Sequence, residues 1–204
     1  MGWSVALACS TVGKAAEVFR HGLAQDPDAA AALARRLYPE YSVVETGDTV
    51  LDFALWPYED ELFVGAYGEA LVVCDRRLFR VDDQARGLAD EIAGALPGGS
   101  CGVLVLHSVV SGCWFRWYEH NRPQRDVFVT ADDGVVVDLG DRLPAERPFW
   151  AGIDAGEPDV PLPFDYEEYG LALAREHLFG RGIADRGPDG FLALELPLRR
   201  FKLA

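Results

Sequence analysis

The chain has 204 residues, of which 25% are charged and 50% are hydrophobic. This balance is typical of a folded soluble protein and excludes a disordered or fibrous chain, so we expect one globular domain over residues 1–204. The 19 basic and 33 acidic residues give a formal net charge of −14. Such a charge disfavours binding to nucleic acid and favours basic protein partners. The alternative explanation is that the acidic residues only keep the protein soluble.

Cysteine usage and hydropathy predict a cytoplasmic location. The cysteines show no C-x-x-C spacing, and three of them lie in apolar runs, where a free cysteine behaves as a small hydrophobic residue. They are Cys9, Cys74, Cys101 and Cys113. No apolar run reaches the length of about 18 residues that a membrane span needs, and the N-terminus lacks the basic region of a secretory signal. We therefore expect a cytoplasmic protein that does not bind membranes.

The first part of the chain is predicted to contain both strands and helices. Asp26 is a capping residue, Pro27 suits the first position of a helix, and Pro39 ends that helix. Gly68 provides a tight turn between two strands. The elements expected here are strands at 3–9, 49–56, 62–67 and 70–74, and helices at 15–21 and 27–38.

The middle of the chain predicts a helix followed by a group of strands. Leu88, Ile92 and Leu96 fall four residues apart, which indicates an amphipathic helix over 83–96. Residues 103–106 are all apolar, as in a strand at the centre of a sheet that is covered on both faces. An antiparallel meander follows over 113–139, with strands at 113–120, 124–130 and 135–139.

The last part of the chain completes the predicted fold. The segment 143–164 is rich in proline and acidic residues and is expected to be an ordered surface loop. Asp165 and Glu168 form a capping pair for a helix that Gly180 ends, and a last strand is expected at 191–196. Because helices and strands mix without a strict βαβ repeat, we expect an α+β or mixed-sheet α/β fold with three to four helices.

No motif in the chain predicts catalysis. Gly98-Gly99-Ser100-Cys101-Gly102 matches the G-x-S-x-G pattern of hydrolases, but that pattern needs a strand before the serine and a helix after it. Here the predicted order is helix, turn, strand. The histidines do not have the spacing of metal ligands either, so we expect neither a metal nor a cofactor.

Three polar residues at the predicted ends of strands are the alternative catalytic candidates. His107 follows the central strand, Cys9 ends the first strand, and Asp75 follows Cys74. An enzyme or a small-molecule binder would use them around a cleft at the strand ends. A hydrogen-bonded structural histidine and a buried cysteine are the competing interpretations, and we favour them.

The densest group of aromatic residues lies in the predicted strand 113–120. Trp114, Arg116, Tyr118 and His120 alternate along it and would share one face. Trp, Tyr and Arg are the residues that protein-recognition surfaces use most, so this face is a candidate binding site. The alternative is that a helix or a loop covers it. Glu59-Asp60-Glu61, after Trp56-Pro57-Tyr58, is either a solvated turn or a contact for a basic partner.

Five short strings, in this order, resemble an actinobacterial family of unknown function whose members have about this length. They are RRLYP at 35–39, VVCD at 72–75, LHSVV at 106–110, PFWAG at 148–152 and PLPF at 161–164. Members of that family carry an acidic turn with a glycine after the first strand, whereas this chain has Cys9-Ser10-Thr11. The resemblance implies a bacterial cytosolic protein and assigns no catalytic residue.

The leading hypothesis from the sequence is a non-enzymatic interaction protein, such as an immunity-type or regulatory factor. It would bind a protein partner, in particular a basic one, through its acidic surface and the Trp114 face. Such a protein needs only a complementary surface and leaves little trace in motifs. The alternatives are the enzyme or small-molecule binder around His107 and Cys9, and a structural homodimer formed through an exposed strand.

Overall fold

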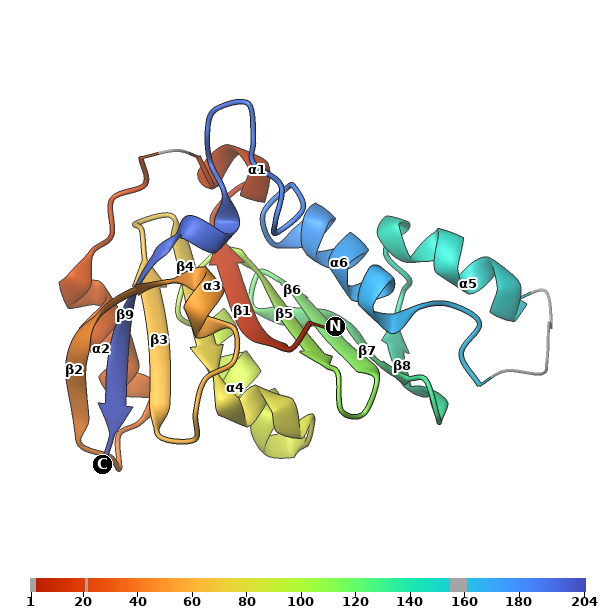
Figure 1. Cartoon of the computed structure of the whole chain (residues 1–204), viewed down its shortest axis with the longest axis horizontal. Coiled ribbons are helices and arrows are strands. Elements are labelled where there is room, and N and C mark those ends of the chain that lie inside the picture. Colours follow the sequence, from red (N-terminus) through yellow and green to blue (C-terminus); the bar gives the residue numbers. More distant parts are fainter. Residues whose placement is uncertain (1–2, 21, 155–160) are drawn as a thin grey trace.

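The residues that the structure describes form an antiparallel sheet of nine strands, around which the protein is organised (Figure 1). The computed structural model describes residues 3–20, 22–154 and 161–204. The order of strands across the sheet is β2-β9-β3-β4-β1-β5-β6-β7-β8. The strands are β1 (Val5–Thr11), β2 (Val43–Val50), β3 (Glu61–Ala66), β4 (Ala70–Asp75), β5 (Ser100–His107), β6 (Gly112–Glu119), β7 (Arg122–Thr130), β8 (Gly134–Gly140) and β9 (Pro197–Leu203).

Helices and short 3-10 turns cover both faces of the sheet. The helices are α1 (Ala15–Val18), α2 (Pro27–Leu37), α3 (Leu51–Ala54), α4 (Asp83–Ala93), α5 (Arg147–Asp154) and α6 (Tyr166–His177). The 3-10 turns are η1 (Arg76–Arg80), η2 (Pro144–Glu146) and η3 (Ala193–Glu195). The capping predictions are confirmed, since Asp26 accepts a hydrogen bond from the Ala29 N–H and Asp165 from the Glu168 N–H.

The α+β class and the meander are confirmed, whereas the mixed sheet is wrong. Every pair of neighbouring strands is antiparallel. Helix α4 does connect two strands that run in the same direction, β4 and β5, but β1 lies between them and is antiparallel to both. The strand–helix–strand order of β4, α4 and β5 therefore looks in the sequence like the connection between two paired parallel strands, but β4 and β5 do not pair with each other.

Two predicted strands and the predicted surface loop are corrected. Residues 51–54 form α3, because Leu51 and Ala54 point into the core while Phe53 points outward. The last strand is β9 and not 191–196, and it pairs with the unpredicted β2. The segment 143–164 contains the 3-10 turn η2 and the helix α5. With α5 and α3, the described residues form six helices, against the expected three to four. Residues 155–160 of the segment lie outside the described residues.

The strand residues alternate between two hydrophobic cores. Along β1, Val5 and Leu7 face the core that α3, α5 and α6 cover, while Ala6 and Ala8 face the core beneath α2 and α4. Strand β5 divides in the same way. Coverage on both faces explains why residues 103–106 are continuously apolar, as the sequence predicted.

Candidate functional site

The face of β6 that carries Trp114, Arg116 and Tyr118 lies beneath α4. Trp114 is 0% and Tyr118 1% exposed, and both pack in the same core as the α4 residues Leu88 and Ile92. The structure therefore shows the alternative in which a helix covers the Trp114 face. His120 lies apart from these three residues, exposed in the turn between β6 and β7.

Two carboxylates accept hydrogen bonds from this face, while Arg116 Nε is buried without a partner among the described residues. Asp126 on β7 accepts hydrogen bonds from Trp114 Nε1 and Arg116 Nη1, both at 2.8 Å. Asp90 on α4 accepts from the Tyr118 hydroxyl at 2.6 Å and from Arg116 Nη2 at 3.1 Å. Because the network joins β6 to β7 and to α4, it fastens the helix to the sheet.

Cys9 and His107 do not share a cleft. Cys9 pairs with Gly102 on β5, and His107 lies five residues further along that strand, which corresponds to about 16 Å. Cys9 is buried and its Sγ donates a hydrogen bond to the carbonyl oxygen of Leu178 at 3.3 Å. Burial raises the pKa of the Cys9 thiol well above its ordinary value, so the thiol is not a ready nucleophile.

Asp75 has a structural role. Its side chain is fully buried and accepts hydrogen bonds from the Tyr38 hydroxyl at 2.9 Å and from Arg77 Nη2 at 2.9 Å. It also caps η1 by accepting from the Arg77 N–H at 2.8 Å. The carboxylate thereby positions the arginine-rich turn that follows it.

Residues 52–59 present aromatic side chains to solvent. Phe53 is 76%, Trp56 38% and Tyr58 67% exposed. The segment is held at Leu55, which is buried and whose carbonyl oxygen accepts a hydrogen bond from the Ala6 N–H at 3.0 Å, and at the buried Pro57. The anchoring residues point inward, so the aromatic residues between them are left on the surface.

Trp56 belongs to a cluster of three rings and one arginine at the end of the sheet where β4 and β5 finish. Its members are Trp56, Phe79, His107 and Arg76. The centroids of Trp56 and Phe79 are 4.6 Å apart, and the His107 ring lies 5.1 Å from Phe79. The Arg76 guanidinium lies 4.7 Å from the centre of the Trp56 ring. Burial and the charge of Arg76 lower the pKa of His107, which favours the uncharged form of the ring.

A hollow of about 440 Å³ adjoins this cluster, and we call it the arginine pocket. Three arginines, one glutamate and one phenylalanine form its walls. They are Arg76, Arg77, Arg80, Glu59 and Phe79. Arg77 pairs with Asp75 and Arg80 pairs with Asp82. The segment 52–59, the ring cluster and the arginine pocket together form one continuous candidate site that contains His107.

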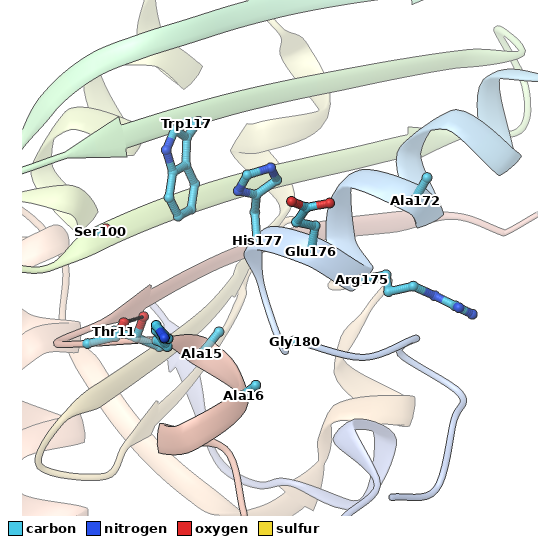
Figure 2. Close-up of a pocket in the computed structure, with 12 residues that line it drawn as sticks. Thr11, Ala15, Ala16, Ser100, Trp117, Ala172, Arg175, Glu176, His177 and Gly180 are labelled. Carbon is cyan, nitrogen blue, oxygen red and sulfur yellow. Dashed lines mark hydrogen bonds between the residues drawn. The ribbon is translucent and has the colours of Figure 1, made fainter. Parts of the chain in front are cut away.

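A second hollow, of about 520 Å³, lies at the opposite end of β1 and β5 (Figure 2). Trp117 and His177 line one side of it and Thr11 and Ala15 the other, while the Arg175 side chain extends away. Ser100 also lines it, but no hydrogen bond joins Ser100 to His177 in the part of the chain that the structure describes. A nucleophile and a base are therefore not paired in this hollow.

Comparison with known proteins places the chain in a family. A model described as a family of unknown function, DUF6928, matches residues 4–201. The chain belongs to this family. No curated protein and no solved structure matches this DUF6928 chain.

Neither a metal-binding cluster nor a membrane-crossing helix occurs among the described residues. Across residues 3–20, 22–154 and 161–204, no group of three or more His, Cys, Asp or Glu side chains could hold a metal ion. Within the same ranges, every helix is too short or too polar to cross a bilayer.

Sequence reasoning found part of the candidate site and missed the rest. It identified His107 and noted the Trp56-Pro57-Tyr58 string before the acidic run. It missed the exposure of Phe53 because 49–56 was assigned to a strand, and it missed Arg76 because η1 has no apolar period. The three arginines that follow the buried β4 within five residues, at 76, 77 and 80, are the signal that could have found the pocket.

Proposed function

We propose that the chain is a non-enzymatic interaction protein that binds a basic protein partner through residues 52–59, which we call the docking segment. The observation that carries this proposal is the exposure of Phe53, Trp56 and Tyr58 within six residues. Aromatic residues dominate the binding energy of protein interfaces when a partner buries them. Folded proteins rarely leave three large rings together in water without a use for them.

Two carboxylates within the docking segment favour a basic partner, although the segment adjoins the arginine pocket. Asp52 and Glu59 flank the aromatic residues, and both are exposed. Neither makes an ion pair with any residue that the structure describes. A lysine or arginine of the partner would pair with them and would stack on the exposed rings of Phe53 and Tyr58, since Arg76 already lies over the Trp56 ring. The net charge of −14 would steer such a partner at long range.

This mode of binding suits an immunity-type or regulatory factor. Such a factor acts by occupying the surface of another protein, so complementarity of shape and charge is sufficient and no bond is made or broken. The separation of Cys9 from His107 supports this proposal over the alternative enzyme, because these two catalytic candidates do not converge.

Site-specific photo-crosslinking tests the proposal. A benzophenone amino acid replaces Tyr58 in the full chain, and the matched control replaces Tyr41, which is 55% exposed outside the docking segment. After irradiation in an extract of the organism that encodes the chain, we expect one discrete adduct at position 58 and none at position 41. Mass spectrometry then identifies the partner, which should have a net positive charge.

The purified pair is then titrated by calorimetry. We expect Trp56→Ala to weaken binding by about thirtyfold or more. Asp52→Asn with Glu59→Gln should weaken binding mainly at low salt. An adduct that forms equally at positions 41 and 58, or an affinity that Trp56→Ala leaves unchanged, contradicts the proposal. A crosslink to a second copy of the chain would replace the basic partner with a homodimer, which light scattering at two concentrations would verify.

A further inference from the structure

The arginine pocket contains a guanidinium group that the fold holds in place without a carboxylate. Arg76 Cζ lies 4.7 Å from the centre of the Trp56 ring and 5.5 Å from that of Phe79. Its Nη1 donates one long hydrogen bond, of 3.5 Å, to the carbonyl oxygen of Pro57. Among the described residues, no carboxylate lies within ion-pair distance of Arg76. Most of its five N–H donors therefore lack a protein acceptor.

The surrounding walls add positive charge. Arg77 and Arg80 line the same hollow. Asp75, which pairs with Arg77, is fully buried and does not line the pocket. The negative charge that compensates Arg77 is therefore not exposed in the pocket. Of the lining residues, Glu59 is the one acidic group, and it makes no ion pair with any described arginine. The pocket thus presents three guanidinium groups and one carboxylate; Arg77 and Arg80 pair with Asp75 and Asp82, so Arg76 is the guanidinium without a carboxylate partner among the described residues.

We propose that the arginine pocket binds an oxyanion of a small ligand, a phosphate or a carboxylate group, through the guanidinium of Arg76. A planar guanidinium can donate two parallel hydrogen bonds to either group. The Trp56 and Phe79 rings already hold the Arg76 side chain in place, so this side chain loses less conformational entropy when the ligand binds. The volume of about 440 Å³ exceeds that of the oxyanion alone, so the body of the ligand would lie against Phe79. The inference needs no protein partner, although the pocket shares Glu59 and the stacked Trp56 ring with the docking segment.

Nuclear magnetic resonance of the ¹⁵N-labelled full chain tests the inference. The chain is titrated at constant ionic strength with inorganic phosphate and, separately, with acetate. We expect saturable shifts of the backbone amides of residues 76–80. Arg76→Met should weaken binding about tenfold or more, because charge-assisted hydrogen bonds are lost. The control Arg35→Met removes an exposed arginine of α2 and should leave binding unchanged.

Two further variants keep the test decisive if Arg76→Met perturbs the fold. Glu59→Gln should tighten binding about twofold or more, because it removes the repelling charge. Arg76→Lys should weaken it, because lysine keeps the charge and loses the planar fork. Tighter binding of phosphate than of acetate identifies a phosphate ligand, and the reverse identifies a carboxylate. The inference is overturned if neither probe saturates, if Arg76→Met binds as the wild type does, or if Glu59→Gln leaves the affinity unchanged.

Discussion

Replacing Glu146 with leucine should destabilise the protein by about 3 kcal/mol. Glu146 is fully buried in the segment that sequence reasoning assigned to a surface loop. Its carboxylate accepts hydrogen bonds from Arg125 Nε and Nη2, both at 2.8 Å. It also accepts from the Tyr169 hydroxyl at 2.5 Å, from the Leu143 N–H at 2.7 Å and from Trp150 Nε1 at 3.2 Å.

The magnitude follows from what remains after the substitution. Removing one partner of a buried ion pair generally costs about 3–5 kcal/mol, because an uncompensated charge is left behind. Arg125 keeps Asp138 at 2.5 Å and the carbonyl oxygen of Leu139 at 3.0 Å, so we take the lower end of that range. For a chain of 204 residues, a loss of about 3 kcal/mol lowers Tm by about 6–12 °C.

Urea unfolding followed by tryptophan fluorescence measures the effect. The control Glu40→Leu removes an exposed carboxylate and should change the free energy of unfolding by less than about 0.5 kcal/mol. The double variant Arg125→Met/Glu146→Leu should recover at least about 1 kcal/mol relative to Glu146→Leu, because the buried guanidinium is then absent and the partly exposed Asp138 keeps its ion pair with Arg142. A loss below about 1 kcal/mol for Glu146→Leu, or a double variant less stable than the single one, would refute this reasoning.

Three further outcomes are expected. Burial lowers the pKa of His177 from its ordinary value of 6.5, so the unfolded chain binds more protons below that pH. Its contribution to stability is therefore complete above pH 6.5 and is lost as the pH falls, and urea unfolding at pH 7.5 and 5.5 should show a shallower decline for His177→Gln than for the wild type. Ellman's reagent should label no thiol of the native chain and all four in guanidinium, because burial raises the pKa of each, and rapid labelling of one native thiol would contradict this. These thiols are Cys9, Cys74, Cys101 and Cys113. Tyr58→Ser should leave the free energy of unfolding within about 0.5 kcal/mol, whereas Tyr118→Phe should lose about 1 kcal/mol with its hydrogen bond to Asp90; equal losses would contradict the burial of the Tyr118 face.

Local signals predicted most of the strands near the centre of the sheet. The continuous apolar run at 103–106 indicates a strand covered on both faces, and Asp132-Asp133-Gly134 indicates a hairpin, because each signal depends only on neighbouring residues. The edge strand β2 escaped prediction because its residues are half exposed and polar. Pairing with β9 positions it, and Arg199 of β9 forms ion pairs with Glu45 and Asp48 of β2. Such contacts between residues about 150 positions apart leave no local pattern.

The alternation of Leu51, Phe53 and Leu55 led to the incorrect strand at 49–56. Over so few residues, the apolar pattern of a strand cannot be told from that of a single helical turn. The burial of Leu51 and Ala54, which indicates the helix, is visible only in the folded chain. The loop assignment of 143–164 failed for a related reason. Glu146 reads as a solvated carboxylate until Arg125, which is 21 residues earlier, supplies the buried charge that it neutralises.

The two aromatic groups of this chain differ in what the neighbouring elements provide for them. On β6, Trp114 and Tyr118 lie in a central strand whose face must be covered, and Asp126 and Asp90 satisfy their polar atoms there. Trp56 instead follows a helix of only four residues and precedes the buried Pro57, and its ring remains partly exposed. Density of aromatic residues alone therefore does not identify a recognition surface. In residues 52–59 the buried Leu55 and Pro57 fix the backbone, and the rings between these anchors stay in water.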